Sequence, residues 1–192
     1  MILIFAVAFG LFATTARSLL TRRRLIYPSL RLGWLVWLAV IPQIFCYTIP
    51  VTAKLIPGLY LPYILVGSMA GLLIFTLANL LTPGFWLMML GLASNLMAII
   101  SNGGWMPISP ETLTRLHPER MLEVWRIGER LALSKDRILP QGNTNLLFLT
   151  DIFPGPSWLS YKFAFSIGDV ILSAGVIIFL WSLSKQSRRT PC

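Results

Sequence analysis

The sequence is poor in charge, and above all in acid. Only 12% of its 192 residues are charged, about half the share of a soluble domain, while 56% are hydrophobic and the mean hydropathy is +0.73. Residues 1–110 contain no Asp or Glu, and all seven acids lie between Glu111 and Asp169. This composition excludes an ordinary soluble domain and predicts a polytopic membrane protein.

Cysteine and histidine are also scarce. Cys46 lies in an apolar run and Cys192 ends the chain, so the sequence predicts neither a disulfide framework nor a metal site. The single histidine, His117, precedes a proline in a polar segment and receives no catalytic role. We expect no cofactor. The net charge of +9 does not indicate a nucleic-acid partner, because the basic residues cluster beside apolar runs, as topology signals do.

Five apolar runs predict an all-α transmembrane bundle of five spans, at residues 1–20, 32–49, 59–80, 85–101 and 161–183. Basic residues follow the first run, at 17–31, and the last run, at 185–189. By the positive-inside rule, the protein is then a multi-pass protein of the cell membrane with its N-terminus outside and its C-terminus cytoplasmic. A cleaved signal peptide is the alternative for the first run, although no positive charge precedes it.

The sequence divides into three parts. Residues 1–101 form a four-span bundle, residues 102–157 form a long extracytoplasmic loop, and residues 158–192 form the fifth span and a cytoplasmic tail. The loop carries six acids and six bases, a balance that a translocated loop tolerates. Apolar and charged residues at helical spacing predict an amphipathic helix over residues 110–134, broken near His117. Gly67 and Gly71 form a small-xxx-small pair that we expect to face another helix.

Two acids in residues 149–175, LTDIFPGPSWLSYKFAFSIGDVILSAG, are the candidate catalytic residues. Asp169 lies inside an apolar run, where a carboxylate costs about 2.5–3.5 kcal/mol and is a functional-site candidate by default. The Pro/Gly turn at 154–156 allows Asp151 to return to the depth of Asp169. Two poorly hydrated carboxylates share a proton, which prepares them to activate a water. Alternatively, Asp151 caps a turn and Asp169 pairs with a backbone amide or with a cation such as Lys162.

Two amides accompany these acids. Asn95 and Asn102 lie seven residues apart and share one face of the fourth span. They either bind and orient a substrate or form interhelical hydrogen bonds, worth about 1 kcal/mol each.

The segment LTDIF…FAFSIGDVILSAG resembles the C-terminal part of lipoprotein signal peptidase, the type II signal peptidase. In that family a Val-Asp-Phe element precedes a Phe-Asn-x-Ala-Asp element at the last span. Asp151 and Asp169 match the family's two aspartates, so the resemblance implies an aspartic-type intramembrane hydrolase that uses both. The family's Gly-Asn-x-x-Asp-Arg motif is missing, and Ser166 stands where the family has Asn.

The whole chain, with its NGGWMPISPE and SIGDV segments, also resembles an uncharacterised family of small bacterial membrane proteins. This resemblance implies a bacterial source and no activity. We therefore predict an accessory or scaffold subunit of a membrane assembly, with the lipid bilayer and other membrane subunits as its partners. The hydrolase is the alternative. A transporter has less support, because the sequence shows no inverted repeat. Close carboxylates at an outward-facing groove would favour the hydrolase.

Overall fold

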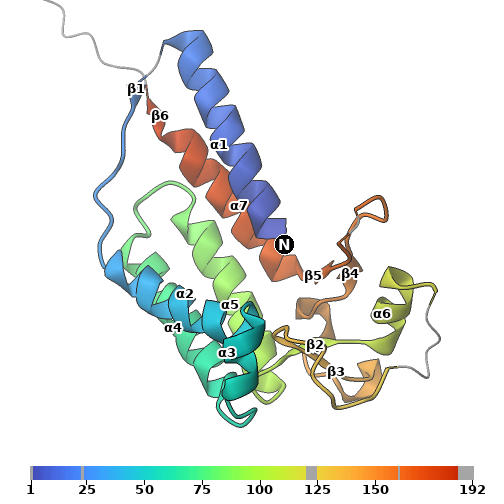
Figure 1. Ribbon diagram of the computed structural model, residues 1–192. Coiled ribbons are helices and arrows are strands. Elements are labelled where there is room, and N and C mark those ends of the chain that lie inside the picture. Colours follow the sequence, from blue (N-terminus) through green and yellow to red (C-terminus); the bar gives the residue numbers. More distant parts are fainter. Residues whose placement is uncertain (1, 23, 120–124, 160, 186–192) are drawn as a thin grey trace, which may run out of the picture.

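The computed structural model describes residues 2–22, 24–119, 125–159 and 161–185, and this part of the chain is mostly helical (Figure 1). It contains seven α-helices: α1 (Ile2–Thr21), α2 (Trp34–Tyr47), α3 (Pro50–Leu55), α4 (Leu61–Ala78), α5 (Phe85–Ser101), α6 (Pro110–Leu116) and α7 (Ile167–Ser182). The five longest helices lie at the five apolar runs, because an unbroken apolar segment satisfies its backbone most simply as a helix.

Only two of these helices reach the length of a membrane span. Helices α1 and α4 have 20 and 18 residues and are apolar enough to cross a membrane, whereas α2, α5 and α7 are apolar but have 14 to 17 residues. At about 1.5 Å per residue, α2 covers ~21 Å of a hydrocarbon core that is ~30 Å thick. Helices α2, α4 and α7 are shorter than their predicted spans, and the largest difference is at α7, which begins at Ile167 and not at residue 161.

Helix α7 is the centre of the helical packing. It lies between α1 and α5, while α4 packs against α5 on one side and α2 on the other (Figure 1). The helices therefore follow the spatial order α1, α7, α5, α4, α2. The first and the last helix in the sequence are neighbours.

Two pairs of glycines allow α5 and α7 to approach closely. A Cβ atom on Gly91 would lie 2.5 Å from the carbonyl oxygen of Gly168, and one on Gly175 would lie 2.7 Å from that of Gly84. The two glycines on each side of the interface are seven residues apart, which is about two helical turns. Both contacts therefore recur on one face of each helix, where any larger residue would push the backbones apart.

The glycine pair that the sequence singled out behaves differently. A Cβ atom on Gly71 would contact Ala39 of α2 at 3.6 Å, which is an ordinary van der Waals distance. A Cβ atom on Gly67 would meet nothing within 4 Å. The prediction that Gly67 faces another helix is thus wrong, and this residue lines a groove.

The described residues between 102 and 166 form a cap at one end of the helices (Figure 1). It contains α6, the parallel strands β2 (Met106–Ile108) and β3 (Asp136–Ile138), the antiparallel strands β4 (Phe153–Pro154) and β5 (Ala164–Phe165), and the 3₁₀-helices η2 (Gln141–Asn143) and η3 (Leu147–Leu149). Four buried side chains give the cap an apolar core, namely Ile108, Leu113, Leu116 and Ile138.

The predicted amphipathic helix over residues 110–134 is present only as α6, and its continuation through residues 125–134 is wrong. Helix α6 stops at His117, whose backbone (φ −127°, ψ 68°) is not helical, because a following proline disfavours the α-conformation. Residues 125–134 form turns around Gly128, which has a φ of 86°. Residues 120–124 lie outside the described part of the chain.

Basic segments gather at the end of the helices opposite the cap. Strand β1 (Arg24–Leu25) pairs antiparallel with β6 (Ser184–Lys185), which joins the segments that follow α1 and α7. The side chain of Asn79, after α4, accepts from the backbone N–H of Arg31 at 2.8 Å and donates to its carbonyl at 2.8 Å. The predicted cytoplasmic tail beyond residue 185 lies outside the described residues.

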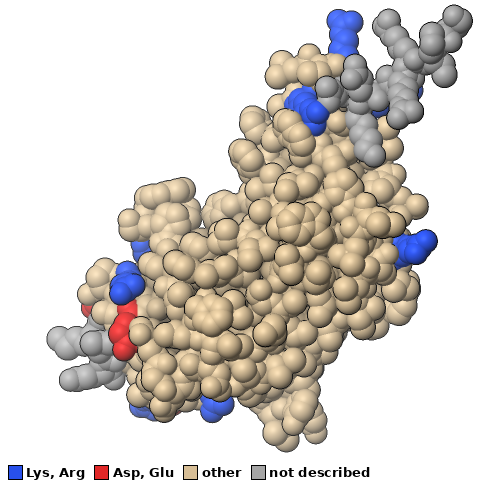
Figure 2. All heavy atoms as spheres, turned by 180° about the vertical axis from the view of Figure 1, so that it is seen from behind, with Lys and Arg blue, Asp and Glu red and all other residues tan. Residues whose placement is uncertain are grey.

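Large apolar side chains cover the outside of the helices. On the face seen in Figure 2, charged residues lie at the two ends and the margins, and the middle is uncharged. Exposed examples on three helices are Phe9 and Phe12 of α1, Trp34 and Trp37 of α2, and Tyr63 of α4. Exposed large apolar side chains on several helices are typical of a surface that contacts another protein or lipid.

Candidate functional site

Asp169 lies in the first turn of α7. The Ser166 hydroxyl accepts from the backbone N–H of Asp169 at 3.1 Å, and the Asp169 carboxylate accepts from the backbone N–H of Ser166 at 3.4 Å. This reciprocal capping box satisfies two N–H groups that a helix start would otherwise leave free. The prediction that the fifth helical run begins at residue 161, well before Asp169, is therefore wrong, because residues 164–165 are extended in β5 and α7 starts two residues before this acid.

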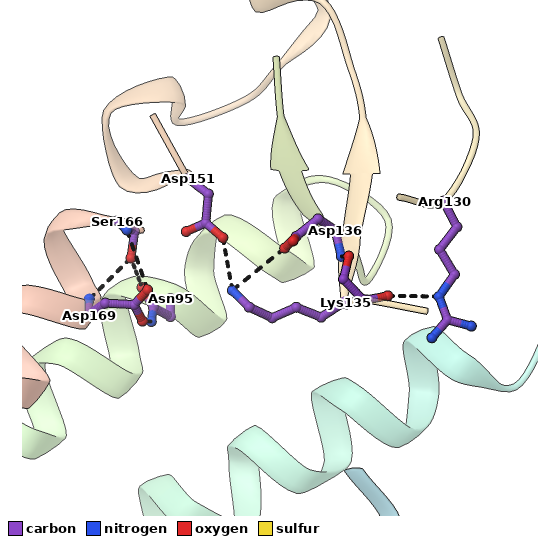
Figure 3. Close-up of polar contacts among 8 residues, drawn as sticks. Asn95, Arg130, Lys135, Asp136, Asp151, Ser166 and Asp169 are labelled. Carbon is purple, nitrogen blue, oxygen red and sulfur yellow. Dashed lines mark hydrogen bonds and ion pairs between the residues drawn. The ribbon is translucent and has the colours of Figure 1, made fainter. Parts of the chain in front are cut away.

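Asn95 of α5 joins this capping box across the helix interface. Its Nδ2 donates to Oδ1 of Asp169 at 2.7 Å, and its Oδ1 accepts from the hydroxyl of Ser166 at 2.9 Å (Figure 3). Asn95 is 4% exposed, so both bonds form away from water. One amide thus fixes the start of α7 against α5.

Asp151 belongs to a second cluster, which lies within the cap. Its Oδ2 accepts from the Nζ of Lys135 at 3.1 Å, and the same ammonium lies 3.8 Å from the carboxylate of Asp136 (Figure 3). Asp151 is 2% exposed, whereas the side chain of Lys135 is 36% exposed. The backbone N–H of Asp151 donates to the carbonyl of Pro107 at 3.3 Å, which holds the acid beside β2.

The charges of this cluster act on one another. Burial raises the pKa of Asp151 to about 8, against the opposing effect of the Lys135 ammonium, and Asp136 and Asp169 add to the rise. Burial lowers the pKa of Lys135, but the three carboxylates outweigh this effect and raise that pKa above its usual range. The cluster has more acids than bases. Lys135 therefore stays charged, and Asp151 binds a proton more readily than an ordinary carboxyl group.

The two candidate catalytic acids have different partners. Asp169 is near enough to influence the pKa of Asp151, and Figure 3 shows them on neighbouring segments. Nevertheless, Asp169 is bound by Asn95 and Ser166, while Asp151 is bound by Lys135. The second oxygen of Asp151, Oδ1, is buried and has no hydrogen-bond partner among the described residues. Among the carboxylate oxygens of Asp151 and Asp169, Oδ1 of Asp151 is thus the one that accepts no hydrogen bond from a described residue.

Asn102 lies apart from these acids, at the C-terminal end of α5. Its Nδ2 donates to the carbonyl of Asn145 at 2.9 Å, and its Oδ1 accepts from the backbone N–H of Asn145 at 2.9 Å. Asn145 in turn donates from its side chain to the carbonyl of Ser101 at 2.8 Å. Asn102 and Asn95 share a helix, but Asn102 fixes the cap and Asn95 fixes α7.

The cation that binds Asp151 was not among the candidate residues identified from the sequence. It is Lys135, whose Nζ lies 3.1 Å from Oδ2 of the acid. The proposed cationic partner of Asp169, Lys162, instead donates to the carbonyl of Ser157 at 2.7 Å. An even balance of six acids and six bases in one loop of an acid-poor chain was the available signal for internal ion pairing.

A groove lies beside the cap but away from the acids. It has a volume of about 1120 Å³, and neither Asp151 nor Asp169 lines it. No group of three His, Cys, Asp or Glu side chains in the described segments is arranged to hold a metal ion. The arrangement as a whole can hold the cap on the helices through buried polar bonds, and it keeps one buried carboxyl group that takes up a proton near neutral pH.

A comparison with known proteins gives one family. The model of a family of unknown function, DUF5317, matches residues 28–181. This range contains helices α2 to α6 in full and α7 except for its last residue. No curated protein and no solved structure matches the chain.

Proposed function

The chain belongs to the family of unknown function DUF5317, and we propose that it is an integral membrane protein serving as a non-catalytic accessory or scaffold subunit of a membrane assembly. One observation carries this proposal. The candidate polar residues are engaged in bonds within the protein, while the outer surface of the helices is apolar. Asn95 joins α5 to α7, Asn102 holds the cap at the end of α5, and Asp151 pairs with Lys135 inside the cap. Such an interior favours a rigid support, and such an exterior favours lipid or other membrane helices.

The membrane arrangement proposed here has five spans, formed by α1, α2, α4, α5 and α7. The two long apolar helices support it, and the exposed apolar side chains of the shorter ones agree with it. The β1–β6 end carries basic residues, among them Arg22 and Arg24, and we place it in the cytoplasm. The charge-balanced cap, with the N-terminus, is then outside. A bilayer adapts to the shorter helices by local thinning.

Partner subunits would contact the apolar faces of the helices. Helix α1 exposes Phe9 and Phe12 at 59% and 73%, and α2 exposes Trp34 and Trp37 at 62% and 69%. Membrane helices associate through packing and a few polar bonds, not through the hydrophobic effect. Aromatic faces that no described part of this chain covers are suited to such packing.

The accessory role makes two measurable claims. The protein should stay in membranes after a carbonate wash, because its helices are embedded and not adsorbed. In a mild detergent it should migrate in a complex heavier than one 21.5 kDa chain with its detergent belt, together with a second protein in fixed stoichiometry. Release by carbonate would reject the membrane location. A single chain in every mild detergent tested would reject the scaffold role.

An aspartic-type intramembrane hydrolase is the second candidate function. The observation that favours it is the raised pKa of Asp151 next to Asp169, together with the free oxygen of Asp151. In this mechanism Asp151, protonated, would act as the general acid and Asp169 as the general base that activates a water. Asp151→Asn and Asp169→Asn should then each abolish cleavage of membrane proteins in a profile of processed products. An unchanged profile in both variants removes this candidate.

A further inference from the structure

The groove beside the cap combines an apolar wall with a cationic rim. Its wall consists of residues from the start of α4 and from the turn before it, namely Ile56, Leu59, Leu61, Pro62, Tyr63 and Val66. Trp105, after α5, lines the same groove, and Arg130 and Arg137 form its rim. Its volume of about 1120 Å³ exceeds the roughly 300–1,000 Å³ of typical small-molecule pockets, so a ligand with a long apolar body fits it.

The two arginines are held side by side. Arg130 and Arg137 are directly opposite each other in an antiparallel bridge. Like charges in such positions repel each other and destabilise the pairing. Neither arginine lies within 4 Å of a carboxylate oxygen of any described residue. No close ion pair with a described residue therefore relieves the repulsion, although the Asp136 carboxylate acts on Arg130 at longer range.

Neutral groups fix the orientation of both guanidinium groups. The Nε of Arg130 donates to the carbonyl of Ser134 at 2.7 Å, and its Nη2 donates to the carbonyl of Cys46 at 3.0 Å. The Nε of Arg137 donates to the carbonyl of Gly128 at 2.7 Å. None of these bonds removes charge. Nη1 of Arg130 and both Nη atoms of Arg137 have no hydrogen bond to a described residue, so they remain available to an anion.

Aromatic rings surround the charged rim. The guanidinium carbon of Arg130 lies 5.0 Å from the ring centre of Tyr47 and 5.8 Å from that of Trp105. Tyrosine and tryptophan are enriched at the level of lipid headgroups. In the proposed membrane arrangement, the rim lies where the cap meets the helices. Headgroup phosphates occupy that level, and acyl chains occupy the level of the apolar wall.

We propose that this groove binds an anionic phospholipid, with its phosphate between Arg130 and Arg137 and an acyl chain along Tyr63, Val66 and Gly67. Planar guanidinium groups recognise phosphate oxygens through paired charge-assisted hydrogen bonds. The apolar wall selects a lipid over a free phosphate ion. The inference rests on the proposed membrane location but not on the scaffold role.

The test uses the full chain purified in detergent. Thermal stability and native mass spectrometry would measure binding of phosphatidylglycerol, phosphatidylcholine and inorganic phosphate. We expect phosphatidylglycerol to bind at least tenfold more tightly than phosphatidylcholine and to raise the melting temperature with its concentration. Arg137→Gln should weaken phosphatidylglycerol binding about tenfold, the size of one lost charge-assisted contact. Arg126→Gln is the matched control, because Arg126 belongs to the same segment but pairs with Glu129 at the surface.

A second variant separates the lipid from a free anion. Gly67 lines the groove, and a Cβ atom on it would meet nothing within 4 Å, so Gly67→Leu adds apolar bulk to the groove. It should weaken phosphatidylglycerol binding and leave the weak binding of inorganic phosphate unchanged. Equal affinity for the two lipids, or equal effects of Arg137→Gln and Arg126→Gln, would overturn the proposal. If either outcome is found for a protein that stays in carbonate-washed membranes, the lipid site is rejected while the proposed membrane location stands.

Discussion

The amide of Asn95 on α5 donates to the carboxylate of Asp169 on α7 at 2.7 Å and, through its oxygen, accepts from the hydroxyl of Ser166. This pair joins two helices at the point where one of them begins. Asp169 therefore completes the cap of its own helix and also fixes that helix against its neighbour.

Removing either partner of this pair should destabilise the protein. We expect Asn95→Ala and Asp169→Ala each to cost about 1–3 kcal/mol, because each leaves a buried polar group without its partner. The double variant should cost less than the sum, with a coupling of about 0.5–3 kcal/mol. Chemical unfolding in detergent measures all three. Ser94→Ala is the control, since the Ser94 hydroxyl donates to the carbonyl of Leu90 in its own helix and to no other described residue. Additive effects in the double variant would show that the pair is not coupled.

Stability should fall as pH rises through the neutral range. Burial raises the pKa of Asp151 from 3.8, its value in an unfolded chain, to about 8 in the folded protein. The folded state therefore binds this proton more tightly than the unfolded state does, and protonation stabilises the fold. This contribution is complete below pH 3.8 and is lost as pH rises through about 8. Asp151→Asn keeps the shape without the titration and should flatten this part of the melting-temperature curve. The exposed acid Glu129, replaced by Gln, provides the control. If the melting temperature of Asp151→Asn still falls with pH in this range, another titrating group causes the pH dependence.

Lys135→Met should be harmful for the opposite reason. It leaves Asp151 buried without its cation, which costs about 3–5 kcal/mol when the acid is ionised. The loss should be smaller in acid, where Asp151 is protonated, and larger above pH 8. Melting temperatures of Lys135→Met and of Lys135→Met/Asp151→Asn measure this. The double variant should recover most of the stability, and a double variant as unstable as the single one would contradict the ion pair.

The glycines between α5 and α7 should not tolerate a methyl group. Gly91→Ala places a Cβ atom 2.5 Å from a carbonyl oxygen of α7, and overpacking of this kind costs about 1–3 kcal/mol. Gly67→Ala is the matched control, because its Cβ meets nothing and alanine favours a helix interior by about 0.5–1 kcal/mol. Unfolding in detergent should therefore shift in opposite directions for the two variants. Equal shifts would refute close packing of α5 and α7.

The proposed topology predicts which end of the molecule is exposed outside the cell. In a Cys192→Ser background, Glu129→Cys in the cap should react with a membrane-impermeant thiol reagent on intact cells. Arg24→Cys, in β1 at the other end, should react only after the membrane is permeabilised. Cys46 is buried at 1% exposure and contributes little signal. The reverse pattern would invert the protein in the membrane and place the cap in the cytoplasm.

Helix positions were accessible from the sequence, but one helix start was not read correctly. Apolar runs located α1, α2, α4, α5 and α7 because burial of backbone polar groups leaves few alternatives. The start of α7 was missed although Ser166 and Asp169 form the Ser-x-x-Asp pattern of a capping box. This pattern places Asp169 in the first turn of a helix, where its carboxylate caps the backbone and is not an acid in a helix interior.

The partners of the acids depend on tertiary pairing that no local pattern contains. Lys135 reaches Asp151 because β3 lies parallel to β2, and the chain after β3 returns past β2. The close approach of α5 and α7 left a visible trace in the sequence, namely two glycine pairs at the same spacing of seven. That spacing reveals a contact face on each helix, but only the folded chain shows that the two faces meet.

The position of α7 between α1 and α5 also orders the biogenesis of the protein. Of the seven described helices, α1 is synthesised first. Its main neighbour, α7, is synthesised last, after the cap. Contacts so distant in sequence form late and slowly, because a long loop must close before they exist. Until α7 arrives, Gly10 of α1, which packs against Leu180, and Asn95 of α5 both lack their native neighbours. The packing of α1 and α5 is therefore incomplete until α7 is made, and a chain truncated before α7 would leave the faces of both helices that contact α7 uncovered.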